Sequence, residues 1–592
     1  MPLVKTKTRQ RFSDLILIEA FSHLIATREE IKMLKALTAE QQRWVDETFA
    51  SMTEDQMIGQ MVNERGNIIR GKKDPVEWLK QYPVGSIFTG AEIIDAFSEG
   101  IRVTSGLQRI VEEAAPSIPV VFSGDFENGI GGQITELTRL PRTMGISATF
   151  SESDSYDFGK VIGSEAVAVD VRWCVSPVAD LNLNRENPVV NTRSTGDEPE
   201  HSVRILKSII NGMQDQGCAA CAKHFPGDGI DTRNQHYVTS LQLLSREEWK
   251  KSQGMVFQKL IDEGVMSIMV GHIAFPAYEE RDEKSGKWRP ATCSKIQMTD
   301  LLRKEMKFEG VIASDALCMN GYISWADYET RILDSFNGGV DVFWWPETEK
   351  FFALVKAALK DGRISRQRLE ESARRVLEFK ARLGLDKKVE KKSAGQDYAE
   401  LIAENQKIAK RIGEHCITLL RNRAGVLPLK LASGSRILLF IAPDKPTPQQ
   451  RLQRFADQLR QRSFKVTVAK PKDYELLRSC TEVFDAVIYL CDSNPQYSEH
   501  RGFDGILWNF MSDPNIRNRI MISFGTPYFL YDVDEADTYI NAYYDCEVCI
   551  DAVIKGIFGE IPFAGRSPVR VPYCFDFGDG LTGAVLPKNW TT

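Results

Sequence analysis

Short apolar runs alternate with amphipathic helical segments along the first two thirds of the chain. Apolar runs of this kind are typical of strands that are buried on both faces in a parallel sheet. Eight strands with helices between them, over about 330 residues, are the size and rhythm of a (β/α)8 barrel of the TIM type. The predicted strands are residues 57–63, 84–89, 118–124, 173–178, 218–222, 267–271, 310–313 and 340–344.

The segments on either side of this repeat follow different patterns. Residues 1–44 carry apolar side chains at helical spacing, from Leu15 to Ile25, and predict one or two helices packed on the outside of the barrel. Residues 386–396 are charged and poor in apolar residues, which indicates a linker. The predicted parts are an N-terminal helical segment (1–44), the barrel (45–385), a linker with a connecting helix (386–409) and a second domain (410–592).

The second domain is predicted to be a smaller α/β/α sandwich, because its apolar runs again alternate with helical segments. No Gly-x-Gly-x-x-Gly follows its first strand, so dinucleotide binding is unsupported. The predicted strands are residues 437–442, 464–468, 486–490 and 520–524.

Length and charge exclude several classes of protein. At 592 residues the chain is too long for one core, so two large domains are expected. The net charge of −6 gives no basic field for nucleic acid, and no apolar stretch approaches the roughly 20 residues of a membrane span. Asp14 and Glu19 interrupt the apolar run after the basic N-terminus, which argues against a signal peptide. We therefore expect a cytoplasmic protein without nucleic-acid or membrane partners.

The eleven cysteines are an odd number scattered through apolar strands, as in cytosolic proteins with reduced, buried thiols. Two Cys-x-x-Cys pairs occur, Cys218/Cys221 and Cys546/Cys549. A zinc or redox site needs such pairs in loops that converge. Cys218 and Cys221 fall in a predicted strand, where side chains three residues apart point to opposite faces. We therefore expect neither a metal nor an organic cofactor.

Polar residues follow several of the predicted barrel strands. The carboxyl ends of barrel strands share one face, so these side chains should meet there. A Pro/Gly loop after the fifth strand adds a further imidazole, His236. A series of polar groups at one face needs mutual partners or a ligand, which predicts an active site. The strand-end residues are Asp125, Asp180, Lys223, His224, His272, Ser314 and Asp315.

The motifs at these strand ends resemble those of glycoside hydrolase family 3, and the resemblance spans roughly residues 50 to 575. It implies a retaining exo-β-glycosidase. The similar segments are Lys-His-Phe-Pro-Gly at 223–227, Ser-Asp-x-Leu-x-Met at 314–319, Asn-Pro-x-x-x-x-Arg-Ser at 187–194, the turn at 124–129, Met-x-x-His at 269–272, and residues 523–528 and 561–569 in the second domain.

The position of His236 selects a branch of this family. A histidine on the loop after Lys-His-Phe-Pro-Gly marks the β-N-acetylglucosaminidase branch, whereas the β-glucosidase branch takes its acid/base glutamate from the second domain. His236 falls at the position of that histidine. The resemblance therefore favours hydrolysis of terminal β-N-acetylglucosaminides.

Asp315 and His236 are the candidate catalytic pair. Retention needs two displacements and a covalent sugar intermediate, with Asp315 as an ionised nucleophile near cations and hydrogen-bond donors. An imidazole titrates near neutrality, which suits a general acid/base, and the loop position of His236 would let it swing in once substrate binds. The alternatives are that Asp315 only caps the following helix and that His236 is an exposed loop residue.

A second set of residues is predicted to bind the sugar, since a hydroxyl-rich ring needs charge-assisted donors and a carboxylate acceptor. Asp125 should accept from the hydroxyls farthest from the scissile bond, which would restrict the enzyme to chain ends. His272 either contacts the sugar or orients its neighbours. The candidate set is Asp125, Arg193, Lys223, His224 and His272, with Met319 from the nucleophile segment.

Two positions on the loop that carries His236 depart from the family pattern. Asp228 replaces the second histidine of the loop, and Asn234 stands two residues before His236, where an aspartate partner is expected. An asparagine can hold a tautomer but cannot stabilise an imidazolium by charge. In serine proteases the corresponding Asp→Asn change lowers kcat about 10⁴-fold. The sequence therefore predicts a slow hydrolase with Asn234 in its catalytic set, unless Asp228 or Asp231 supplies the charge.

Three other functions fit the same residues. Phosphate could replace water in the second displacement, because a histidine acid/base repels phosphate less than a glutamate would. A β-glucosidase is the second alternative. A sugar-binding homologue that has lost catalysis is the third, and Asn234 motivates it. The substrate in each case is a small carbohydrate; the aglycone and the oligomeric state stay open.

Overall fold

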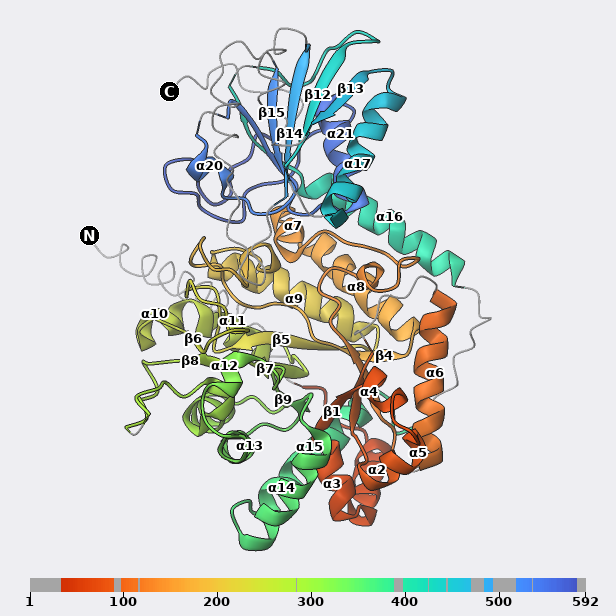
Figure 1. The fold of residues 1–592 in the computed structure, drawn as a ribbon, viewed down its shortest axis with the longest axis vertical. Coiled ribbons are helices and arrows are strands. Elements are labelled where there is room, and N and C mark those ends of the chain that lie inside the picture. The colour runs from red at the N-terminus through yellow and green to blue at the C-terminus, as the bar shows by residue number, and fades with distance from the viewer. Residues whose placement is uncertain are drawn as a thin grey trace, which may run out of the picture.

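Figure 1 shows a barrel with a smaller sheet domain stacked on it. The computed structural model describes residues 34–89, 97–114, 118–283, 285–387, 398–423, 425–442, 446–469, 484–492, 518–534 and 536–582. Most of the predicted N-terminal helical segment, residues 1–33, lies outside them. Among the helices of these ranges, none is long and apolar enough to cross a membrane.

The barrel sheet confirms the predicted (β/α)8 architecture. Its described strands run in the order β10-β1-β2-β3-β4-β5-β7-β9. A parallel bridge between Ala313 and Val342 joins the two ends of the sheet and closes the ring. The strands are β1 Val62–Arg65, β2 Ser86–Phe88, β3 Val121–Gly124, β4 Val171–Cys174, β5 Ala219–Phe225, β7 Ser267–Val270, β9 Val311–Ser314 and β10 Phe343–Trp344; β6 Ser240–Leu241 and β8 Ile273–Ala274 form a separate small ladder.

Helices cover the outside of the barrel. Two of them, α8 and α9, pack closely where Gly159 faces Ile209. A glycine is needed there, because a Cβ on Gly159 would lie 2.1 Å from the carbonyl oxygen of Ile209. The helices are α2 Ala39–Ser51, α3 Glu54–Gln60, α4 Gly66–Arg70, α5 Pro75–Gln81, α6 Phe97–Ala114, α7 Thr143–Ala148, α8 Glu152–Ala168, α9 Pro199–Asp215, α10 Arg246–Lys251, α11 Gln253–Asp262, α12 Asn320–Ile323, α13 Tyr328–Gly338, α14 Thr348–Asp361 and α15 Arg366–Arg382, with a π-helix at Ile296–Glu305.

The structure corrects the first predicted strand, residues 57–63. Its first four residues belong to α3, and β1 begins only at Val62. Thr53 and Gln56 form a capping box, in which each side chain accepts a hydrogen bond from the other residue's backbone N–H. This cap starts a helix just before the apolar residues, and apolar residues alone do not distinguish a short helix from a strand.

The second domain is built on a mixed sheet in the order β11-β16-β15-β14-β12-β13. Strand β11 pairs antiparallel with β16, while the other pairs are parallel. Apolar clusters on the two faces of this sheet confirm the smaller α/β domain, although β11 and β16 were not predicted. Its elements are β11 Thr418–Asn422, β12 Arg436–Ile441, β13 Lys465–Ala469, β14 Ala486–Cys491, β15 Arg519–Ser523, β16 Thr538–Asn541, α17 Pro446–Gln461, α20 Phe529–Asp532 and α21 Glu547–Ile557, entered through α16 Ala399–Cys416.

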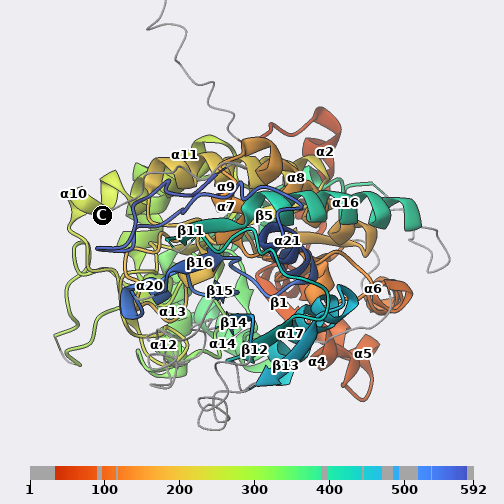
Figure 2. The same cartoon turned by 90° about the horizontal axis from the view of Figure 1, so that it is seen from above.

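The second domain holds the long loop that follows β4. Seen from above in Figure 2, its sheet lies over the barrel. Asn182 Nδ2 donates to the hydroxyl of Tyr528 at 2.5 Å, and Asn191 Nδ2 donates to Thr526 Oγ1 at 3.2 Å. The same loop carries Arg193, so contacts with the second domain help to position a residue that reaches the barrel mouth.

Candidate active site

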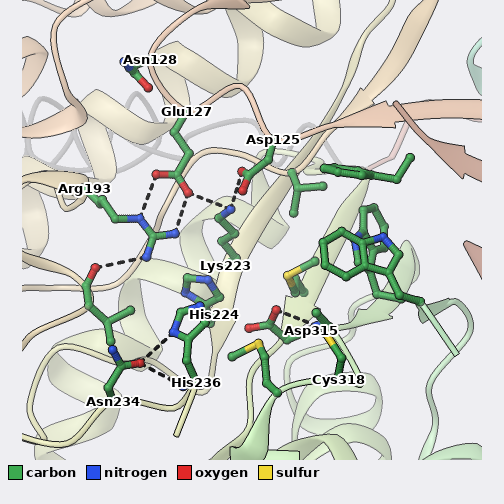
Figure 3. A pocket seen from close by; sticks show the side chains of 18 residues that line it. Asp125, Glu127, Asn128, Arg193, Lys223, His224, Asn234, His236, Asp315 and Cys318 are labelled. Atoms are coloured by element: carbon green, nitrogen blue, oxygen red, sulfur yellow. Dashed lines mark hydrogen bonds and ion pairs between the residues drawn. The ribbon is translucent and has the colours of Figure 1, made fainter. Parts of the chain in front are cut away.

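A pocket of about 350 Å³ lies at the carboxyl ends of the barrel strands (Figure 3). It is lined by side chains that follow or end β3, β5, β9 and β10, and by two loops. Of the nine residues predicted for the site, only His272 is outside its lining. The eight that line it are Asp125, Arg193, Lys223, His224, Asn234, His236, Asp315 and Met319.

Asp315 directly follows β9, and its carboxylate accepts a hydrogen bond from the Ala316 N–H at 2.7 Å. Burial alone would raise the pKa of Asp315, but three nearby imidazoles and this N–H hold the pKa below its usual value. The Asp315 carboxylate is therefore ionised across the neutral range, as a nucleophile requires. The imidazoles belong to His224, His272 and His236.

Asn234 orients His236. The Oδ1 of Asn234 accepts one hydrogen bond from the backbone N–H of His236, at 2.9 Å, and one from His236 Nδ1, at 2.7 Å. The backbone N–H can only donate, so this atom is the amide oxygen and Nδ1 carries a proton. Proton exchange by this ring would therefore use Nε2 rather than Nδ1. Burial lowers the pKa of His236 to about 4, although the nearby Asp315 carboxylate opposes this shift.

Two cations and two carboxylates form a cluster at another side of the pocket. Arg193 binds both oxygens of Glu127, at 2.9 and 2.6 Å. Lys223 Nζ lies 2.8 Å from Asp125 Oδ1 and 2.8 Å from Glu127 Oε1. The Asp125 side chain is 46% exposed and that of Glu127 only 11%. Asp125 is therefore the carboxylate with room to accept hydrogen bonds from a ligand.

Arg193, Lys223 and Glu127 stabilise one another's charged forms. Burial alone would favour the neutral forms, but attraction to Glu127 and Asp125 raises the pKa of both Lys223 and Arg193. The two cations in turn hold the pKa of Glu127 well below its usual value. Arg193, Lys223 and Glu127 thus stay charged and present fixed charges to a ligand.

Asp180 fixes the orientation of His224. Its carboxylate accepts from His224 Nδ1 at 2.7 Å and from the His224 backbone N–H at 3.0 Å. The strand that carries His224 is longer than predicted, because β5 runs to Phe225 and includes both Lys223 and His224. The extra strand residues hold these two side chains on a hydrogen-bonded backbone at the pocket wall.

His272 lies behind the pocket wall and is completely buried. Its Nε2 lies 3.0 Å from the carbonyl oxygen of Ala316, and its Nδ1 lies 2.7 Å from Thr292 Oγ1. Of the two roles considered for His272, this position corresponds to orienting neighbours, since the ring supports the backbone beside Asp315.

The carboxylates considered as substitutes for an aspartate at position 234 are engaged elsewhere. Asp228 Oδ1 accepts from Asn187 Nδ2 at 3.0 Å and from the Gly229 N–H at 2.8 Å. Asp231 accepts from the Arg233 side chain and from the Leu241 N–H. Neither arrangement places a carboxylate on the His236 ring, so Asn234 is its hydrogen-bond partner on the Nδ1 side.

Comparison with known proteins identifies the family. The sequence profile described as "Glycosyl hydrolase family 3 N terminal domain" matches residues 52–379, which is more than half of the chain. The chain belongs to glycoside hydrolase family 3. It is accordingly a glycoside hydrolase that acts on carbohydrate, and the resemblance seen in its motifs is confirmed.

Relatives of this family 3 enzyme extend over both domains. A "Beta-N-acetylglucosaminidase/beta-glucosidase" of Cellulomonas fimi is 29% identical over 89% of this chain and 95% of that protein. Among solved structures, "Beta-glucoside phosphorylase BglX bound to 2FGlc" has a TM-score of 0.78 and 28% identity, covering 91% of this chain and 98% of that one. A family 3 β-N-acetylglucosaminidase from Paenibacillus sp. str. FPU-7 shares the fold, with a TM-score of 0.76, 24% identity, and coverage of 88% and 99%.

Sequence reasoning missed Glu127 in this family 3 site, although Glu127 joins Arg193 to Lys223. Its signal was its place two residues after Asp125, beyond the end of β3, where side chains enter the barrel mouth. The aromatic wall formed by Phe88, Trp344 and Trp345 was also missed. Phe88 and Trp344 fell inside predicted strands and Trp345 just after one, and their apolar character gave no sign that they face a pocket at the ends of β2 and β10.

Among the cysteines within the described ranges, Cys318 is the one that lines this pocket. The ten cysteines that the structure describes are free thiols. Two pairs approach each other, Cys174 with Cys218 at 3.3 Å and Cys546 with Cys549 at 3.5 Å between sulfurs. Within the described ranges no group of three His, Cys, Asp or Glu side chains is placed to hold a metal ion.

Proposed function

We propose that the protein is a retaining exo-β-N-acetylglucosaminidase, with Asp315 as nucleophile and His236 as general acid/base. One observation carries this proposal. An ionised carboxylate and an oriented imidazole, held on different loops, line the same pocket and influence each other's charge. The relative from Cellulomonas fimi, named for both β-N-acetylglucosaminidase and β-glucosidase activity, covers both domains and supports a β-glycoside of one of these two sugars. The position of His236 favours N-acetylglucosamine between them.

The two residues act in sequence. In the first displacement the Asp315 carboxylate attacks the anomeric carbon, the bond to the aglycone oxygen breaks, and His236 Nε2 gives that oxygen a proton. In the second, His236 takes a proton from water, the water oxygen attacks the same carbon, and the bond to Asp315 breaks. The hydrogen bond from Nδ1 to Asn234 keeps the same ring nitrogen in use for both transfers.

The ion-pair cluster supports action on chain ends. Arg193, Lys223, Glu127 and Asp125 close one side of a pocket whose 350 Å³ suits a single sugar ring. The Asp125 carboxylate is partly exposed and can accept hydrogen bonds from sugar hydroxyl groups. The two cations are held by ion pairs, Arg193 with Glu127 and Lys223 with both carboxylates. We expect the terminal non-reducing sugar to fill this space. A further sugar attached to that ring on its non-reducing side would meet the closed end of the pocket.

The test is a panel of nitrophenyl β-glycosides that differ in the sugar. We expect the highest kcat/KM on the N-acetylglucosaminide and a lower value on the glucoside. A glucoside that is turned over faster would replace the proposed sugar with glucose. Complete inactivity on the panel, with a sugar still bound in calorimetry, would support the sugar-binding alternative instead.

Phosphorolysis is a second candidate, which one feature of the site favours. The acid/base pair of Asn234 and His236 has no carboxylate, so an anionic acceptor meets less repulsion there than it would beside an Asp or Glu. The neighbour described as a β-glucoside phosphorylase, with 28% identity, supports this candidate. Turnover in phosphate and in an inert buffer distinguishes the two reactions, because phosphorolysis yields a glycosyl phosphate and hydrolysis a free sugar.

We also propose that the enzyme works in the cytoplasm. The odd number of cysteines supports this location, because paired cysteines are the rule in oxidising compartments. Fractionation of cells that express the full chain tests it, and recovery in an exported fraction would contradict it.

A further inference from the structure

The loop that carries His236 caps the helix that follows Asp315. This histidine loop, residues 234–239, packs against α12, whose first N–H groups need acceptors from outside the helix. Met319 precedes α12 and gives no side-chain cap. The acceptors come from the histidine loop: the Asn320 N–H donates to the His236 carbonyl at 3.0 Å, and the Gly321 N–H donates to the Gln235 carbonyl at 3.2 Å.

Gly321 allows the two segments to come this close. A Cβ at Gly321 would lie 2.3 Å from the Gln235 carbonyl oxygen and 2.9 Å from that of Val238. Thr239 adds a third contact, since its hydroxyl donates to the Gly321 carbonyl at 2.8 Å. The histidine loop thus surrounds Gly321 with backbone oxygens, and any larger residue would push the loop away from α12.

A buried side chain ties the same two segments to the barrel. Gln235 is fully buried, and its Oε1 accepts from the His272 N–H at 2.9 Å, just after β7. The His272 ring in turn lies 3.0 Å from the Ala316 carbonyl oxygen, one residue beyond Asp315. The histidine loop and the Asp315 segment therefore share one support, His272. Asp315 directly follows β9, so a shift of the loop alone at Gly321 changes the separation of His236 from Asp315.

We propose that Gly321 is a positioning residue that sets the separation of His236 from Asp315. The inference rests on the proposed roles of those two residues. Relief of a 2.3 Å contact requires the loop to move by about 1 Å, and a misplacement of that size costs a rate on the order of 10²-fold. The loss falls on proton transfer, because the Asp315 segment stays anchored to the barrel strand while the loop moves.

The experiment compares Gly321→Ala with Gly106→Ala, a control in α6 where a Cβ meets nothing within 4 Å. We expect kcat/KM to fall on the order of 10²-fold on substrates with poor leaving groups and much less on a dinitrophenyl glycoside, which needs little protonation. Gly106→Ala should match the wild type. Equal losses on both substrates, or no loss on either, would overturn the assignment.

A milder pair of variants guards against a folding failure of Gly321→Ala. Thr239→Val removes the hydroxyl contact to Gly321 with little change in shape, and Thr239→Ser keeps it. Thr239→Val should show the same leaving-group dependence to a smaller extent, and Thr239→Ser should restore wild-type behaviour. Identical kinetics of the two variants would count against the contact.

Hydrogen exchange tests the contact without any activity. Peptides covering residues 234–239 and 320–323 should exchange slowly in the wild type and faster together in Thr239→Val. Free exchange of 234–239 in the wild type beside a protected 320–323 would refute the shared support. If the wild type turns over no glycoside, the proposed function fails, while the exchange data still decide whether the loop and the helix are joined.

Discussion

Asn234 Oδ1 accepts hydrogen bonds from both the backbone N–H and the ring Nδ1 of His236, at 2.9 and 2.7 Å. A neutral amide therefore does the orienting work of an aspartate without its charge. The imidazole is held in one direction, but this neutral acceptor adds no charge to stabilise the protonated ring, and the nearby Asp315 carboxylate only partly opposes the effect of burial. The effect of burial is therefore the larger one, and it lowers the pKa of His236 to about 4.

The first prediction concerns the nucleophile. Asp315→Asn should lower kcat by several orders of magnitude, because the amide cannot form the covalent glycosyl intermediate. The melting temperature should change little, since the Ala316 N–H can still donate to the amide oxygen. Steady-state kinetics and a thermal melt check both statements. A well-folded variant with near-normal kcat would remove Asp315 from the mechanism.

The second prediction concerns the general acid. His236→Ala should reduce kcat/KM on the order of 10²-fold for glycosides with poor leaving groups, because their departing oxygen needs a proton. Activated aryl glycosides should lose much less in the first displacement. A series of aryl glycosides with graded leaving-group pKa measures the difference. Equal losses along the series would contradict an acid/base role.

The third prediction is the pH dependence of this step. The acid must be protonated, and the folded pKa of His236 is lowered to about 4. Above that pH the protonated fraction falls about tenfold per unit. Asp315 stays ionised in this range, because its pKa lies below the usual value. Hence kcat/KM for a poor leaving group should decline steadily from about pH 4 to pH 7.

The control for this profile is an activated aryl glycoside, whose kcat/KM should be nearly independent of pH in the same range. A plateau that extends to pH 6.5 for both substrates would show that His236 keeps its ordinary pKa. A decline with both substrates would instead indicate that the nucleophile or the fold titrates.

The sequence predicted the barrel because its repeat of apolar runs and helices is long and regular. It failed where local chemistry decides the outcome. The capping box at Thr53 and Gln56 turned a predicted strand into a helix. Strand β16, Thr538–Asn541, is short and half polar, so its pattern did not stand out from a loop.

The candidate site was predicted on the same basis and with the same limit. Residues at strand ends converge in any barrel, so Asp125, Lys223 and Asp315 could be grouped before their contacts were known. The partners of these residues could not, since ion pairing depends on side-chain reach rather than chain position. The three-dimensional distances therefore added Glu127 to the site and decided between the two roles that the sequence left open for His272.

The fourth prediction concerns Glu127. Glu127→Gln leaves Arg193 and Lys223 with one carboxylate instead of two, in a cluster whose cations are largely buried. Removing one partner of a buried ion pair costs about 3 kcal/mol, so the melting temperature should fall. KM should rise because the cations that face the sugar are no longer fixed in place.

The matched control is Glu136→Gln, an exposed glutamate on the same loop. This variant should keep the wild-type melting temperature and KM. Thermal melts and initial-rate kinetics on all three proteins give the comparison. Wild-type KM and stability in Glu127→Gln would show that Asp125 alone suffices to hold both cations.

The last prediction concerns Asn234. Asn234→Asp would keep an oxygen at the Oδ1 position and place a second one where Nδ2 is now buried with no hydrogen-bond partner among the described residues. A carboxylate there has the His236 ring as its counter-charge, which raises the pKa of His236. More of the acid is then protonated at neutral pH. We expect kcat/KM at pH 7 to rise at least about tenfold, or about 1.4 kcal/mol of transition-state stabilisation.

This gain should be confined to proton transfer, and that makes it testable. It should appear with poor leaving groups, move the decline in the pH profile to higher pH, and be absent with an activated aryl glycoside. Asn234→Ala is the control and should lower kcat/KM, because the ring loses its orientation. Asp228 and Asp231 bind Asn187 and Arg233 instead of His236, so neither should mask the effect. No gain at any pH between 5 and 8, with the loop still ordered, would refute the charge argument.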